Sequence, residues 1–193
     1  WGHQRTTNNN PSRTTYYYIG ASADYTLNVN DHRIFALAGY SQEEEYSGSW
    51  DEFSIMSAYT KVNYSFKDKY LLEGTIRTDG SSRFGSGNKF GVFPAVAVGW
   101  NLHNENFLKN IKSVSSLKLR ASYGSLGNDE SVGLYSYQNV ISGSNGVESS
   151  YGNPDITWES VDMFDIGFDL GLFKNKIELT FDYYNKKTRD III

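Results

Sequence analysis

The sequence predicts an all-β protein, and three observations carry that prediction. Aromatic residues make up 16% of the 193 residues, with 15 Tyr, and such side chains favour pleated, half-buried strands. The 18 Gly suit frequent turns between strands. Apolar and polar residues also alternate with a period of two in about eight separate stretches. With 39% hydrophobic residues, the chain can form a folded structure.

Four alternating stretches lie in the first half of the chain. In residues 17–27 the odd positions are apolar, whereas the even positions are mostly polar or glycine. Residues 33–46 alternate less cleanly, because both faces are small and apolar until the acidic run at 43–45. Residues 58–66 and 70–77 alternate again, and the three residues between them predict a tight turn.

The second half contains four more stretches, at 95–102, 117–124, 164–172 and 177–184. In 164–172 apolar side chains alternate with Asp and Gly, and in 177–184 they alternate mainly with Glu, Thr and Asp. Only Lys, Asn and Lys separate these two stretches, which predicts a hairpin.

The predicted connections alternate in length. The short ones are 28–32, 67–69 and 174–176, and the long ones, rich in Gly, Ser and Asn, are 47–54, 80–91 and 126–157. Asp79-Gly80 predicts the start of a long loop. Residues 103–116 belong to the short-turn end, and "NENFLKNIKS" within them predicts a helical turn. Short turns at one end and long loops at the other are typical of outer-membrane barrels, although soluble sandwiches can share this feature.

Several functional classes lack support in the sequence. Without cysteine there is no disulfide framework and no cysteine-built metal site. His3, His32 and His103 lack ligand spacing, and Gly85-Ser86-Gly87 lacks the Lys-Ser/Thr of a phosphate loop. Ser81 and Ser82 lie in a Gly-rich stretch, and no motif links them to a catalytic base. We therefore predict no enzyme, no metal and no cofactor. A net charge of -4 without a basic stripe predicts no nucleic-acid partner.

Three sequence blocks identify a family resemblance. "NYSFKDKYLLEGTIRTDGSSRFGSGNKFGVFPAVAVGWNLHNENFL", "LKLRASYGSLGN" and "GNPDITWES" through "FDIGFDLGLFKNKIELTFDYYNKKTRDII" resemble, in order, the SusC/RagA class of TonB-dependent outer-membrane transporters. The first third of the chain fits only by its strand pattern.

The resemblance implies a transmembrane barrel of about 22 strands. Residues 1–193 would be a partial barrel domain of about eight consecutive antiparallel strands from its middle, without the plug domain. The implied function is energy-coupled import of oligosaccharides or peptides through a Bacteroidetes-like outer membrane. The implied partners are membrane lipid, a SusD-like surface lipoprotein, and the TonB complex through N-terminal parts absent from this chain.

Membrane insertion would assign each strand face to a solvent. Tyr70, Leu72, Gly74 and Ile76 would face lipid, and Glu73, Thr75 and Arg77 the lumen. An Arg at the lipid midplane costs about 2–4 kcal/mol, so a one-residue register slip is opposed. Girdle aromatics are expected near the short turns and farther up the barrel: Tyr64, Phe66, Tyr70, Tyr17 and Tyr183.

The candidate substrate-binding residues are charged and lumen-facing: Glu73, Arg77, Lys118, Arg120, Asp165 and Asp169. A solvated wall with structural ion pairs is the favoured interpretation of these residues. Trp158 and Tyr151 lie where sugars could stack, but a role in the aromatic girdle or in loop packing explains them equally well. Two alternative folds remain at this point. One is a complete small eight-stranded barrel with a structural or adhesion role, and the other is a soluble β-sandwich that binds carbohydrate.

Overall fold

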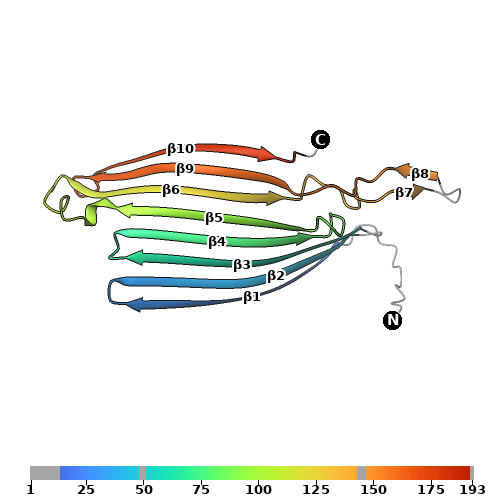
Figure 1. Cartoon of the computed structure of the whole chain (residues 1–193), viewed down its shortest axis with the longest axis horizontal. Helices are drawn as coiled ribbons and strands as arrows, with labels where there is room; N and C mark the ends of the chain where they lie inside the picture. The colour runs from blue at the N-terminus through green and yellow to red at the C-terminus, as the bar shows by residue number, and fades with distance from the viewer. Residues whose placement is uncertain (1–13, 48–50, 143–146, 192–193) are drawn as a thin grey trace.

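The computed structural model describes residues 14–47, 51–142 and 147–191. It contains ten strands and one short 3₁₀ helix (Figure 1). The strands are β1 (Thr14–Val29), β2 (His32–Ser47), β3 (Asp51–Phe66), β4 (Tyr70–Ser81), β5 (Phe90–Asn101), β6 (Val114–Asn128), β7 (Val140–Ser142), β8 (Val147–Ser150), β9 (Glu159–Leu172) and β10 (Ile177–Arg189). The helix η1 spans Leu102–Asn104. All eight predicted strands are present.

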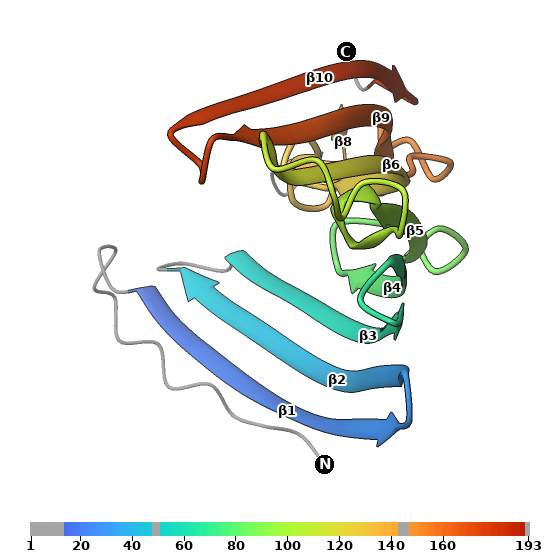
Figure 2. The same ribbon diagram turned by 90° about the vertical axis from the view of Figure 1, so that its left-hand side faces the viewer.

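Eight strands form one antiparallel sheet in the order β1-β2-β3-β4-β5-β6-β9-β10. Viewed from the short-turn end, the sheet curls into an open C (Figure 2). Within the described residues β1 pairs only with β2, and β10 only with β9, so the eight strands do not close on themselves. The structure therefore contradicts the small closed barrel.

One register runs through the whole sheet and keeps alternate residues on the same face. Across β3, β4 and β5, for example, Val62 pairs with Gly74 and Gly74 with Val96. The convex face defined by this row carries exposed apolar side chains on every long strand, whereas Leu126 and Met163 are exposed on the concave face. Within the described residues no second sheet covers the convex face, so the sandwich interpretation is also wrong.

The predicted short connections are present, with ends that differ by no more than two residues, and they use residues with positive φ. Asn30 has φ 53°, and Lys67 and Asp68 have φ 54° and 50°. Two successive residues in this region give a turn whose twist matches that of the flanking strands. The β9–β10 turn has three successive residues with positive φ, Phe173, Lys174 and Asn175. These turns fix the pairing of each hairpin.

The long connections are shorter than predicted, because the strands continue past the alternating apolar stretches. Ser47 pairs with Asp51, so most of the loop predicted at 47–54 belongs to β2 and β3, and residues 48–50 lie outside the described ones. Asp79 and Gly80 remain in β4 without positive φ, so they do not begin the loop. Gly80 is needed for space instead, since a Cβ there would lie 2.8 Å from Cδ1 of Phe90.

The connection predicted at 126–157 contains a second, two-stranded sheet made of β7 and β8, part of a projection at the long-loop end (Figure 1). Residues 143–146 of this segment lie outside the described ones. The helical turn predicted in 104–113 is present only in part. The helix η1 begins two residues earlier, and the amide of Lys109 donates to the carbonyl of Glu105 at 3.1 Å.

Aromatic side chains form a row on the convex face beside the short turns. His32, Phe66, Tyr70 and Trp100 are successive neighbours, with ring centroids 4.7, 6.4 and 6.1 Å apart. The row contains two of the predicted girdle residues, and Tyr64 stacks on His32. No helix among the described residues is long and apolar enough to span a membrane.

Candidate functional site

The concave face of the sheet is the candidate site, because it gathers the charged side chains. In register it carries all six predicted residues: Glu73, Arg77, Lys118, Arg120, Asp165 and Asp169. They come from three strands, β4, β6 and β9. The alternation predicted from sequence places them on this face because each strand keeps its polar residues in the same phase.

Arg120 on β6 is the centre of the largest ion-pair cluster among the described residues. Its guanidinium lies 3.2 Å from an oxygen of Asp165, 3.2 Å from Asp169 and 2.5 Å from Asp182 on β10. The hydroxyl of Thr180 donates to the other oxygen of Asp169 at 3.1 Å. Three carboxylates thus surround one cation, and the cluster ties three adjacent strands together.

Other charges on this face are also paired. The Nε of Arg77 donates to both oxygens of Asp79, at 2.7 and 2.8 Å, and its Nη2 donates to Ser57 at 2.8 Å. Lys61 lies 2.9 Å from Glu73. Side chains engaged in this way are held in place and are less free to bind a passing solute. The pairing is consistent with a solvated wall.

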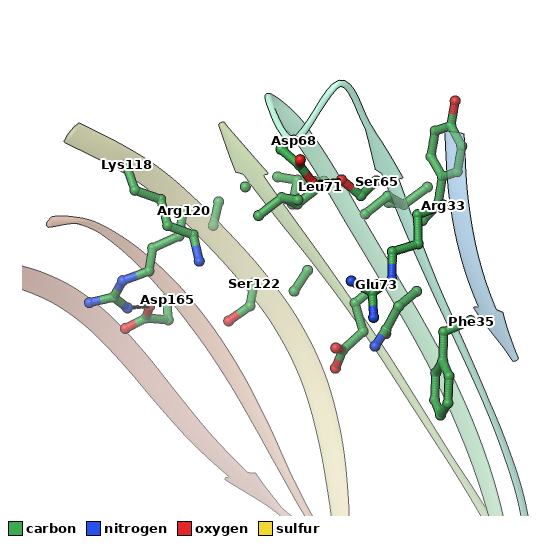
Figure 3. A pocket seen from close by; sticks show the side chains of 17 residues that line it. Arg33, Phe35, Ser65, Asp68, Leu71, Glu73, Lys118, Arg120, Ser122 and Asp165 are labelled. Carbon is green, nitrogen blue, oxygen red and sulfur yellow. Dashed lines mark hydrogen bonds and ion pairs between the residues drawn. The ribbon is translucent and has the colours of Figure 1, made fainter. Parts of the chain in front are cut away.

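A hollow of about 740 Å³ lies on this face towards the short turns. Figure 3 shows Arg33 and Phe35 on one flank and Lys118, Arg120 and Asp165 on the other. Its floor is formed by small residues, including Ala97, Gly99 and Ser122. Within the described residues, Arg33 and Lys118 have no ion-pair partner. A second hollow of about 370 Å³ continues along β5 and β6.

A small buried core lies at the long-loop end of the sheet. Trp158 is only 7% exposed, and its ring lies 5.0 Å from that of Phe84 and 5.5 Å from that of Phe93. Its indole N–H donates to the carbonyl of Lys89 at 3.1 Å. Trp158 is therefore a loop-packing residue, whereas Tyr151 is 83% exposed.

The polar contacts that hold this core together were not predicted from the sequence. Ser81 donates to Asp129 at 2.6 Å, and Arg83 donates to the carbonyl of Val132 at 2.5 Å. The two contacts join residues 48 and 49 positions apart, so no local pattern could have indicated them. The "DGSSRFG" motif consequently serves to hold the β4–β5 and β6–β9 connections against each other.

A second polar centre lies at the short-turn end. The carboxylate of Glu105 accepts hydrogen bonds from Lys69 at 2.7 Å, Tyr70 at 2.9 Å and Trp100 at 3.2 Å. These three donors, with Lys69 foremost, hold the pKa of Glu105 below its usual value. The side chain thereby fixes two aromatic rings of the convex row.

None of the described residues forms a group of three or more His, Cys, Asp or Glu side chains suited to a metal ion. His32 stacks on aromatic rings, and His103 contacts the backbone of Leu117. His3 lies outside the described residues. The arrangement can present charge, hydroxyls and rings to a solute.

Known proteins are similar to this two-faced sheet in sequence and in fold. The family described as "TonB dependent receptor-like, beta-barrel" matches residues 1–193. The chain belongs to that family. Its members are outer-membrane β-barrel proteins that act as receptors and transporters, which agrees with the open, two-faced sheet.

Named relatives place the chain in the SusC/RagA class. It is 37% identical to TonB-dependent receptor P3 of Formosa agariphila, over 91% of this chain and 18% of that protein. It is 33% identical to TonB-dependent receptor SusC of Bacteroides thetaiotaomicron, over 87% of this chain and 17% of that protein. The structure of the RagAB peptide transporter matches with a TM-score of 0.83 and 26% identity, over 93% of this chain and 24% of that one.

The chain therefore spans less than a fifth of the length of the two named receptors and 24% of the RagAB chain. The matches confirm the recognition of the family and the antiparallel barrel architecture that the sequence predicted. They assign no role to individual residues of the concave face.

Proposed function

We propose that the chain forms part of the barrel wall of an energy-coupled outer-membrane importer of oligosaccharides or peptides. The observation that carries the proposal is the division of one continuous sheet into two faces. The convex face exposes rows of apolar side chains, and the concave face carries the ion pairs and the hollows. A wall between hydrocarbon and an aqueous passage requires this division.

The dimensions of the convex face support the proposal. On β2 its apolar stretch runs from Ile34 to Tyr40, and with the stacked ring of His32 it covers about nine residues, close to the number a tilted strand needs to cross a bilayer. Beyond Tyr40 the same face turns polar at Gln42 and Glu44, which hydrogen-bond to each other at 2.8 Å. The strands would leave the membrane there and continue into water.

Partners and substrate class are part of the same proposal. The relatives include a protein named SusC and a structure titled as a peptide transporter. Their resemblance supports a SusD-like surface lipoprotein and the TonB complex as partners, and a Bacteroidetes-like outer membrane as location. We also propose that the plug domain lies outside residues 1–193 and that the whole barrel has about 22 strands.

In this proposal the six charged residues of the concave face act mainly as wall. Arg77, Arg120, Asp165 and Asp169 are held by partners that are themselves part of the sheet. Such groups keep the lumen hydrated and stabilise the strand register, but they do not bind a solute tightly. The proposal assigns no bond chemistry to the chain.

Uptake by living cells tests this function. Labelled oligosaccharides and peptides would be supplied to cells carrying the whole protein, to cells lacking it, and to cells carrying it without TonB. We expect at least one labelled solute to accumulate only when both the protein and TonB are present. Accumulation that is indifferent to either component would contradict the proposal.

A further inference from the structure

Two tyrosine rings lie against the concave wall of β1–β3, each over a glycine. A Cβ atom at Gly20 would lie 2.8 Å from Cζ of Tyr18, and one at Gly39 would lie 2.7 Å from Cε2 of Tyr59. The rings therefore occupy the space that side chains would fill. Each ring therefore leans over the backbone at its glycine.

Phe93 is a third ring that lies over glycines, and in its case another aromatic side chain packs on it. A Cβ at Gly91, for example, would lie 2.9 Å from Cε2 of Phe93. Trp158 then packs on Phe93, which is left only 7% exposed. Tyr18, by contrast, is 61% exposed. Tyr59 is half-buried, and within the described residues no ring contact covers either Tyr18 or Tyr59.

The two rings are close enough to serve one extended ligand. Gly20 pairs with Ser41 on β2, and Gly39 lies two residues farther along that strand. With about 4.8 Å between strands and about 3.4 Å per residue, the two glycines lie about 8 Å apart. The rings above them form a stepped platform on the concave face, nearer the long-loop end than the hollow of Figure 3.

Hydrogen-bonding groups of both kinds surround the platform. Glu43 is directly opposite Tyr18 in register, and Ser22 and Ser41 lie beside the two glycines. Among the described residues, the phenol oxygens of Tyr18 and Tyr59 have no hydrogen-bond partner, so both are available to a ligand. The platform therefore places hydrogen-bond donors and acceptors beside two aromatic rings that have no stacking partner among the described residues.

The charge around the platform limits the ligand. Arg77, opposite Tyr59 in register, is neutralised by Asp79, whereas Glu43 and Glu45 have no ion-pair partner among the described residues. The local excess is negative and disfavours anionic solutes. A neutral sugar ring fits these conditions, because it has an apolar C–H face for stacking and hydroxyls around its edge for the polar groups.

We propose that Tyr18 and Tyr59 form a stacking platform for neutral oligosaccharides. This proposal rests on the importer function above and narrows its substrate class. The glycines are part of the site, since only a residue without Cβ lets each ring lie on the wall. Glu43 and the neighbouring serines would accept and donate hydrogen bonds at the edges of the bound sugar rings.

Equilibrium binding to the purified whole transporter in detergent tests the platform. The probes are neutral linear oligosaccharides of six or seven residues, drawn from α-glucan, β-glucan, mannan and xylan, with an uncharged heptapeptide for comparison. We expect at least one oligosaccharide to bind with a Kd below about 1 mM. Tyr18→Ala and Tyr59→Ala should each weaken it roughly three- to tenfold, whereas the two Tyr→Phe changes should retain most binding.

Two further variants separate stacking from general damage. Gly20→Ala keeps both tyrosines but displaces the ring of Tyr18, so it should weaken binding as Tyr18→Ala does. Tyr25→Ala removes an exposed tyrosine from the convex face of the same strand and should leave the Kd unchanged. Unaltered oligosaccharide binding in Tyr18→Ala and Tyr59→Ala would overturn the platform, as would binding of the peptide alone or of no probe.

Failure of the platform can be distinguished from failure of the importer function. Binding in detergent needs neither TonB nor a membrane. Tyrosine-dependent binding without TonB-dependent uptake would refute the importer and leave the platform standing. Uptake that is unaffected by both Tyr→Ala changes would refute the platform and leave the importer standing.

Discussion

Arg120 on β6 reaches across β9 to Asp182 on β10, with 2.5 Å between Nη2 and Oδ1. The residue paired with both of them is Gly167, which has no side chain to separate them. A Cβ at Gly167 would lie 3.1 Å from Cζ of Arg120 and 2.5 Å from the carbonyl oxygen of Phe181. This glycine therefore allows one guanidinium to connect three strands.

Gly167→Ala should destabilise the sheet by about 1–3 kcal/mol, because the new methyl group overfills the space below the ion pair. Gly74→Ala is the matched control, since a Cβ there would meet no atom within 4 Å. Urea unfolding of the whole protein in detergent measures both changes. Equal midpoints for the two variants would show that the ion pair does not depend on Gly167.

A charged side chain at the middle of the apolar band on the convex face should destabilise the protein in the membrane. Val96 pairs there with Gly74, and Val96→Arg should cost about 2–4 kcal/mol in lipid. Ala97→Arg, the next residue on the same strand, lines the concave hollow and should be tolerated. Folding yield in lipid vesicles, followed by heat-modifiable mobility on gels, compares the two. A greater loss for Ala97→Arg would reverse the assignment of the faces.

The hydrogen bonds to Glu105 should make part of the stability depend on pH. Its pKa in the folded protein lies below about 4.5, so the stabilisation is fully present above that pH and is lost as the pH falls through the folded value. Glu105→Gln should lower Tm at neutral pH, and the difference from the unchanged protein should shrink below about pH 4.5. A difference that grows on acidification would contradict this account.

The loop core should protect the long connection between β6 and β9 from proteases. Trp158→Ala removes a side chain that fills the space between Phe84 and Phe93, and should cost about 3–5 kcal/mol locally. Brief treatment of intact cells with a glutamyl endopeptidase, which can cut after Glu130 and Glu148, followed by mass mapping, should then reveal new cleavage within residues 129–158. Tyr151→Ala, at an exposed position of the same connection, should not increase cleavage.

The sequence was sufficient to predict the strands and their faces, because alternation records the solvent on each side of a sheet. It was insufficient for the strand ends. Beyond Tyr40 and Thr78 the ladders continue in polar residues, and their hydrogen bonding is not visible in local hydropathy. The contact of Ser81 with Asp129 depends on folding of the whole sheet, and so does the loop core around Trp158.

The candidate site was predictable only as a set of charged positions on one face. Pairing across strands decides which of these side chains form ion pairs with each other. That pairing depends on the register and on glycines such as Gly167. The tyrosine platform was hidden for the same reason. Tyr18 and Gly20 are neighbours on one face in any extended strand, but Tyr59 meets Gly39 only because β2 and β3 pair in this register.

Cysteine accessibility tests the division of the two faces most directly. The chain has no native cysteine, so single cysteines can be placed at Leu72, Glu73, Thr75 and Ile76, with any cysteine elsewhere in the whole protein replaced. In outer-membrane preparations, a water-soluble maleimide should label positions 73 and 75, and a lipid-soluble probe should label 72 and 76. Aqueous labelling of 72 and 76 with lipid labelling of 73 and 75 would contradict the account.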